Sequence, residues 1–249
     1  VPSYTYFLSG YAALENSILF EHPLNEKCRT LLRLSNLFDQ LDHHIKLDSE
    51  WDSRAAIRPL LEIAAILARA DIKSDLFKEL DRHNKALSGM AQVAGVDHER
   101  LARVLADISH QSEKLKSTSE QLGKALRSDD FLKGISQRSG IPGGCFEFDL
   151  PQLHYWLQLP YDERNTQLST WRGSIQSTEQ TTKLLLSLIR HSQVPVEVIA
   201  ENGIYNQNLD TNNSSQMVRV RIPAEELLFA EVSGSKHRFS IRFLETSSW

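Results

Sequence analysis

Residues 141–160 read IPGGCFEFDLPQLHYWLQLP and mark the point at which the chain changes architecture. After a glycine turn, two sets of side chains alternate: Phe146, Phe148 and Leu150 face one way, and Cys145, Glu147 and Asp149 face the other. A period of two is typical of a half-buried strand. We therefore predict a strand here, directly after a long run of residues with helical periodicity.

That preceding run, residues 18–138, has the three- and four-residue spacing of amphipathic helices. The expected helices span 24–45, 49–70, 73–93, a segment that begins at Asp97, and a short piece at 131–135. Pro59 should kink or restart the second helix, and Asp97 can cap the fourth. Residues 111–130 are polar, so they form either a solvent-facing helix end or a helix that needs a partner chain.

The remainder of the chain combines one long helix, 162–190, with short β-favouring runs. These runs lie at 194–200, 203–209, 217–222, 226–232 and 237–244, and Glu201-Asn202-Gly203 has the composition of a hairpin turn. The predicted fold class is α+β. An N-terminal extension (1–17) and an N-terminal all-helical domain (18–138) precede a C-terminal β-rich domain (139–249), which has an antiparallel sheet and one substantial helix.

Composition limits the class of protein. The 249 residues are 41% hydrophobic and 24% charged, with a formal net charge of -4, which is typical of a soluble globular protein and argues against an electrostatic nucleic-acid binder. No apolar run is long enough to span a bilayer, and the N-terminal residues lack the basic start of a signal peptide. Cys28 and Cys145 form no disulfide framework. We expect a cytoplasmic protein with reduced thiols and no membrane insertion.

Motifs for catalysis or metal binding are not evident. Asp42, His43 and His44 are consecutive on a predicted helix, where neighbours point about 100° apart and cannot chelate one ion together. Gly140, Gly143 and Gly144 lack the Lys-Ser/Thr of a phosphate-binding loop and precede a predicted strand. We expect no catalytic residue, metal or cofactor. A hydrolase with an unrecognised site between the domains remains the alternative.

Arginines are placed regularly on two of the predicted strands. Alternation puts Arg238 and Arg242 on one face of their strand with Ser240 between them, and Arg219 and Arg221 on one face of theirs. If the two strands are neighbours, four guanidinium groups share one sheet face, and each suits a carboxylate. The other interpretation is a solvated face that is balanced by nearby acids: Glu225, Glu226, Glu231 and Glu245.

Basic residues on the predicted helices are less informative. Arg69 and Lys73, between the second and third helices, could extend the basic surface, but cations there also complement the helix dipole. Arg29 and Arg33, one turn apart on the first helix, are either exposed surface or the rim of a helix pairing.

Four blocks of sequence together resemble one family. They are FEHPLNEKCRTLLRL (20–34), LFKELDR (76–82), IPGGCFEFDLPQLHYWLQLP (141–160) and SGSKHRFSIRF (233–243). In this order they resemble the ZapD family, the Z-ring-associated proteins of bacterial cell division. The resemblance implies a cytoplasmic, non-enzymatic homodimer at the midcell division ring that binds the C-terminal tail of the division GTPase FtsZ and bundles its protofilaments.

The same resemblance, together with the arginine pattern, nominates the contact residues. The expected FtsZ-tail contacts, in order of preference, are Arg238 and Arg242, then Arg69 and Lys236, then Arg219 and Arg221. For the dimer contact we expect Arg33 and His154. Nucleic-acid binding by the basic strands is a further possibility, and it would require an affinity that falls steeply with salt.

Overall fold

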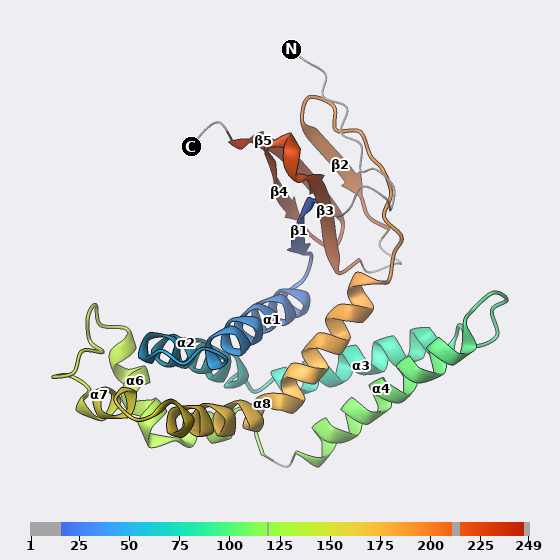
Figure 1. The fold of residues 1–249 in the computed structure, drawn as a ribbon. Helices are drawn as coiled ribbons and strands as arrows, with labels where there is room; N and C mark the ends of the chain where they lie inside the picture. The colour runs from blue at the N-terminus through green and yellow to red at the C-terminus, as the bar shows by residue number, and fades with distance from the viewer. Residues whose placement is uncertain (1–15, 119, 211–214, 247–249) are drawn as a thin grey trace. The chain divides into compact units, whose positions relative to one another are not determined.

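The computed structural model of the chain describes residues 16–118, 120–210 and 215–246 (Figure 1). Its helices are α1 (Glu26–Ile45), α2 (Glu50–Leu67), α3 (Ile72–Ser88), α4 (His98–Ser117), α5 (Lys124–Ser128), α6 (Asp130–Ser139), α7 (Pro151–Leu157) and α8 (Tyr161–Arg190). Its strands are β1 (Ser17–Pro23), β2 (Ile204–Asn208), β3 (Met217–Pro223), β4 (Leu228–Gly234) and β5 (Arg238–Glu245). The predicted α+β class is confirmed.

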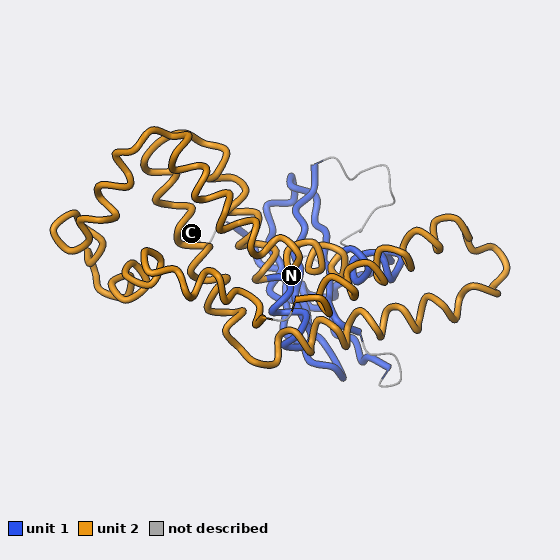
Figure 2. Tube along the Cα trace, turned by 90° about the horizontal axis from the view of Figure 1, so that it is seen from below, with its two compact units in different colours: residues 1–32, 187–249 blue, residues 33–186 orange. Residues whose placement is uncertain are grey.

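The chain forms two compact units (Figure 2). Unit 1 consists of residues 1–32 together with 187–249, and unit 2 consists of residues 33–186. Unit 1 therefore contains all the strands of the described residues and draws them from both parts of the sequence. The expected domain boundary after residue 138 falls inside unit 2. Most of the predicted extension, residues 1–15, lies outside the described residues.

Unit 1 contains two antiparallel sheets among its described residues, β1-β3 and β2-β5-β4. Residues of both sheets pack on one core. The buried core residues are Leu24, Val218, Val220, Ile222, Leu228 and Ile241. Phe239 and Phe243 of β5 pack against this core from the same strand face as Ile241. The arginine positions of β3 and β5 therefore lie on the faces of these strands that point away from the core.

Four of the predicted β-favouring runs form strands, but the run at 194–200 does not. It has no assigned strand, and Val194, Val196 and Ile199 are exposed. The predicted turn that follows is present: Asn202 and Gly203 have φ of 53° and 75°, the left-handed pair that a two-residue hairpin loop requires. Strand β1 was not predicted, because its partner β3 lies far away in the sequence.

Unit 2 contains helices α2 to α7 and most of α1 and α8. The predicted cap of α4 is confirmed, since an oxygen of Asp97 accepts a hydrogen bond from the Arg100 N–H at 2.9 Å. Pro59 lies inside a continuous α2 rather than restarting it. Helix α3 ends at Ser88, before Gly89, instead of continuing to residue 93. Among the described residues of the polar segment 111–130, residues 111–117 belong to α4, 124–128 form the short α5, and Asp130 begins α6.

The predicted strand at residues 145–150 is wrong. The segment forms successive turns, in which the N–H groups of Gly144, Phe146 and Leu150 donate to carbonyl groups three or four residues earlier. The carbonyl oxygen of Cys145 accepts a hydrogen bond from Arg54 of α2. A strand needs a neighbouring strand to pair its backbone N–H and C=O groups. In this segment those groups form hydrogen bonds within the turns and with the side chain of Arg54 instead.

The following residues of the motif form helix α7, with Pro151 at its start. Its Trp156 joins a buried aromatic cluster, in which Phe131 stacks on Trp171 at a centroid distance of 5.7 Å and lies 5.5 Å from Trp156. The Trp171 indole N–H donates to the Asp129 carboxylate at 2.9 Å. The motif therefore holds α6, α7 and α8 together through aromatic packing rather than through a sheet.

Candidate functional site

Two exposed arginines lie on the outer face of strand β5. Arg238 and Arg242 alternate with Phe239, Ile241 and Phe243, which belong to the core. The antiparallel register places Asn208 beside Arg238, and Glu231 beside Arg242. Directly opposed residues in a sheet have their side chains on the same face, so these polar groups share the outer face with the arginines.

The middle of the same face is uncharged. Ser240 lies between the two arginines, and its register partners are Asn206 on β2 and Ser233 on β4. Residues of this face border a surface depression of ≈ 610 Å³ at one end of the sheet, which is lined by Asn206, Gln207, Asn208, Ser233, Gly234, Ser235, Arg238, Phe239 and Ser240. Arg238 thus stands in a polar surface depression rich in hydrogen-bonding groups.

The two guanidinium groups keep most of their donors free. Arg242 Nη1 lies 4.0 Å from Glu231 Oε2, and the two side chains are 63% and 59% exposed. Among the described residues, Arg238 has no ion pair, and neither arginine side chain donates a hydrogen bond to another described residue. A guanidinium carries five N–H donors, so this face can accept anionic groups. Lys236 is exposed in the turn just before β5.

Arg219 and Arg221 do not share this face. They lie on β3, which pairs with β1 and not with β5, so the condition under which four guanidinium groups would share one sheet face is not met. Arg219 and Arg221 alternate with Val218, Val220 and Ile222, so they lie on the face of β3 that points away from the core. Sequence alternation identified the faces of the strands, but it could not determine which strands are neighbours.

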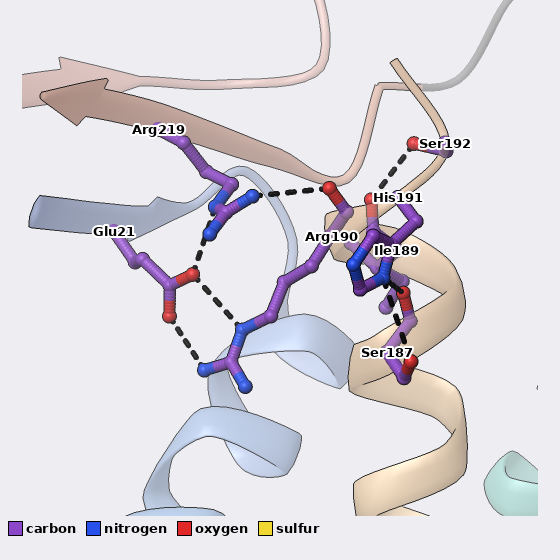
Figure 3. A network of polar contacts seen from close by, with 7 residues as sticks. All are labelled: Glu21, Ser187, Ile189, Arg190, His191, Ser192 and Arg219. Carbon is purple, nitrogen blue, oxygen red and sulfur yellow. Dashed lines mark hydrogen bonds and ion pairs between the residues drawn. The ribbon is translucent and has the colours of Figure 1, made fainter. Parts of the chain in front are cut away.

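The guanidinium group of Arg219 also donates hydrogen bonds within unit 1 (Figure 3). Its Nε donates to Glu21 at 3.0 Å, and its Nη1 donates to the carbonyl oxygen of Arg190 at 3.0 Å. The Arg190 side chain binds the same Glu21 carboxylate with two nitrogens, at 2.9 and 2.7 Å. This arrangement fastens the end of α8 to the β1-β3 ribbon, and it leaves Arg219 few donors for a ligand.

Arg69 belongs to unit 2. It lies in the connection between α2 and α3, where its Nη2 is 3.1 Å from Asp71 and lowers the pKa of that carboxyl through a hydrogen bond. With Lys73 it lines a small depression of ≈ 230 Å³. Lys73 Nζ donates to the Thr118 carbonyl at 2.5 Å, so this lysine has a structural contact.

The two residues expected at the dimer contact, Arg33 of α1 and His154 of α7, are both exposed. His154 Nε2 lies 3.5 Å from the Glu147 carboxylate. In the same motif, the rings of Phe146 and Phe148 stack in parallel at 6.0 Å and are 59% and 80% exposed as residues. Stacked exposed aromatic rings are typical of interaction surfaces.

The Asp42-His43-His44 sequence takes part in packing rather than in a ligand cluster. Asp42 receives a hydrogen bond from Arg172 of α8 at 2.6 Å. Burial works to raise the pKa of Asp42, but the hydrogen bond and charge of Arg172, together with the charges of Lys183 and Lys46, lower it, and the net direction is downward. His44 lies 3.3 Å from Asp52. Within the described ranges, no three His, Cys, Asp or Glu side chains form a group able to hold a metal ion.

A buried histidine on α3 was not singled out by the sequence. His83 Nε2 lies 2.8 Å from Arg82 Nη2, and Arg82 pairs with Glu79 at 3.0 Å. Burial, and then the charge of Arg82, lower the pKa of His83 to about 4, while Glu79 acts in the opposite direction. The imidazole is therefore neutral at physiological pH, with Nε2 as the acceptor from Arg82.

None of the helices in the described part of the chain combines the length and the hydrophobicity needed to cross a membrane. Neither cysteine takes part in a disulfide: Cys28 is buried, and Cys145 is partly exposed.

Comparisons with known proteins agree with the sequence blocks. The family model ZapD, described as a cell division protein, matches residues 32–242. The chain is 39% identical to a Cell division protein ZapD of Methylococcus capsulatus, over 93% of this chain and 91% of that protein. It is 36% identical to a protein of the same name from Klebsiella pneumoniae and 34% identical to one from Escherichia coli, each over 94% of both chains. From the extent of these matches, the chain belongs to the ZapD family of cell division proteins.

Proposed function

We propose that this cell division protein binds the C-terminal tail of FtsZ on the outer face of the β2-β5-β4 sheet. One observation carries the proposal. In a chain of a cell division family, β5 presents two exposed arginines with unoccupied donors, Arg238 and Arg242. Arginine binds carboxylates through two parallel hydrogen bonds, and the surrounding amides and hydroxyls can bind a peptide backbone.

The other basic residues predicted to bind the tail differ in how they would contribute. Lys236 precedes β5 and extends the positive charge of its outer face. Arg69, in unit 2, would contribute a separate contact with the partner. Arg219 donates hydrogen bonds to Glu21 and to the carbonyl of Arg190, so we assign it a structural role rather than a role in peptide binding. Arg221 shares the outer face of the other sheet with Arg219.

We further propose that the chain acts as a homodimer, so that two tail sites bridge FtsZ protofilaments into bundles. Two modest sites on one assembly give avidity along a polymer without a high affinity at either site. Arg33, His154 and the exposed Phe146–Phe148 pair are the proposed dimer contacts. In this view the protein is not an enzyme, and it works in the cytoplasm at the midcell division ring.

Co-sedimentation with FtsZ polymers tests the proposal. The protein should pellet with polymers of full-length FtsZ and should stay in the supernatant when the FtsZ tail is removed. Light scattering should report bundles with the full-length polymers alone. Pelleting that does not depend on the tail, or no pelleting at all, would contradict the mechanism.

A charge-reversal pair assigns the site. Arg238→Glu with Arg242→Glu should abolish tail binding and leave the circular dichroism spectrum and the dimer unchanged. Arg100→Glu with Arg103→Glu is a matched control, because both arginines are exposed on α4 and have no ion pair within the described residues. If both double variants bind as well as the wild type, the face of β5 is ordinary surface.

A further inference from the structure

The two arginines of β5 have different surroundings, although they share a strand face. Arg242 lies in a cross-strand row with Glu231 of β4 and Ile204 of β2, whereas Arg238 is paired with the neutral Asn208. One arginine therefore has a carboxylate beside it, and the other has an amide. This asymmetry follows from the register of the sheet, and it gives the two positions different access to an incoming anion.

The Glu231–Arg242 pair is a weak one. Its closest approach is 4.0 Å, it includes no hydrogen bond, and both side chains are more than half exposed. An exposed pair of this kind contributes little stability because water and salt screen it. A carboxylate from a ligand that accepts two hydrogen bonds from the guanidinium would bind more strongly than Glu231 does. Glu231 is thus positioned to be displaced.

We propose that Glu231 competes with the bound peptide for Arg242, so that Arg238 is the first anchor and Arg242 binds only when Glu231 gives way. This inference rests on the proposed function, since it concerns the same face and the same partner. Glu231 then limits the affinity of each site for peptides that carry two carboxylates, because the second carboxylate must displace it from Arg242. A peptide with a single carboxylate can bind Arg238 without displacing Glu231.

The geometry also defines the peptide that fits. Arg238 and Arg242 are four residues apart on one strand, and four residues of strand span about 13 Å. An extended peptide that follows β5 would place two carboxylates four residues apart against them. Between the carboxylates it would cross Asn206, Ser240 and Ser233, whose amide and hydroxyl groups can bind its backbone. The occupant is therefore an extended, doubly acidic segment.

The first test is the affinity of a synthetic FtsZ-tail peptide, measured by fluorescence anisotropy with the full chain at constant ionic strength. Glu231→Gln should tighten binding about two- to fivefold, the range that an exposed ion pair supports. Glu225→Gln is the matched control, because it removes the same charge from an exposed position that has no ion pair within the described residues. It should change the affinity much less.

A double-mutant cycle distinguishes competition from a general charge effect. If Glu231 acts through Arg242, Glu231→Gln should no longer tighten binding in an Arg242→Ala background. In addition, Arg238→Ala should weaken binding by the wild-type protein more than Arg242→Ala does. In the Glu231→Gln background, the two alanine variants should weaken binding to a similar extent.

The outcomes separate the inference from the proposed function. If the wild type binds the tail but Glu231→Gln binds no more tightly than Glu225→Gln, the competition is rejected and the proposed function stands. A gain that persists in the Arg242→Ala background also rejects it. If the wild-type protein does not bind the tail, the proposed function fails, and the inference fails with it.

Discussion

Glu21 and Arg190 are 169 residues apart in the sequence and form a two-point ion pair, with Arg190 Nε and Nη2 at 2.9 and 2.7 Å from the two carboxylate oxygens. Arg219 binds the same carboxylate at 3.0 Å. The Glu21 side chain is only 15% exposed. A single carboxylate thus joins strand β1, strand β3 and the end of helix α8, and it gives the fold of unit 1 a central polar contact.

Replacing that carboxylate should destabilise unit 1. In Glu21→Gln, two arginines lose a charged partner in a partly buried position, and we expect a loss of about 1–3 kcal/mol in the free energy of unfolding. Urea unfolding followed by circular dichroism measures it. Glu225→Gln, which removes an exposed carboxylate, is the control, and equal stability of the two variants would contradict the role of Glu21.

The buried imidazole of His83 predicts how stability depends on pH. Its pKa is lowered to about 4 in the folded protein, so between pH ~6.5 and that value the unfolded chain binds a proton that the folded chain does not. Stability should therefore fall as the pH is lowered through this window, on the order of 1–3 kcal/mol after allowance for partial solvent screening.

Thermal unfolding at a series of pH values checks this expectation. A His83→Gln variant should lose the part of the slope that arises from this residue, whereas His98→Gln, at an exposed position on α4, should keep it. If both variants follow the wild-type slope, the imidazole of His83 is not the group that titrates.

Two glycines of unit 2 should respond in opposite directions to alanine. Gly123 has φ of +69°, and a Cβ there would meet the Leu67 Cβ at 3.0 Å, so Gly123→Ala should cost about 1–2 kcal/mol. Gly173 lies inside α8, where an added Cβ would meet no side chain within 4 Å, so Gly173→Ala should stabilise by about 0.5–1 kcal/mol. Chemical denaturation of both variants gives the comparison, and a change of the same sign in both would refute it.

The exposed phenylalanine pair predicts an effect on self-association. Phe146→Ser with Phe148→Ser should weaken the proposed dimer at least tenfold, because the change removes two large apolar side chains from an interface. Sedimentation equilibrium provides the measurement. Met90→Ser with Val93→Ser removes an exposed apolar pair elsewhere in unit 2 and should leave the association constant unchanged. Equal effects of the two double variants would place the dimer contact elsewhere.

Local patterns in the sequence were sufficient for much of the fold. The alternation around Arg238 and Arg219 identified β5 and β3, because a strand with one face on a core must alternate. Asp97 identified a helix start, because a capping carboxylate acts on N–H groups only three residues away. These features depend on neighbours in the sequence, and the two strands and the helix start were predicted correctly.

Features that depend on distant residues were not predictable in this way. The alternation at 145–150 has the period of a strand, yet Arg54 of α2 binds its Cys145 carbonyl and turns satisfy the rest of its backbone. Strand β1 exists because β3 pairs with it. Glu231 could be listed as a balancing acid, but its place beside Arg242 requires the register of β4 and β5.

The split composition of unit 1 has a consequence for biosynthesis. Strand β1 emerges from the ribosome early, but its partner β3 is translated roughly two hundred residues later, after the whole of unit 2. Unit 2 can begin to fold during translation, as domains generally do. The backbone of β1 stays unpaired with β3 until β3 has been translated. The core of unit 1, which combines residues of β3, β4 and β5, therefore cannot be completed until all of these strands have been translated, after the whole of unit 2.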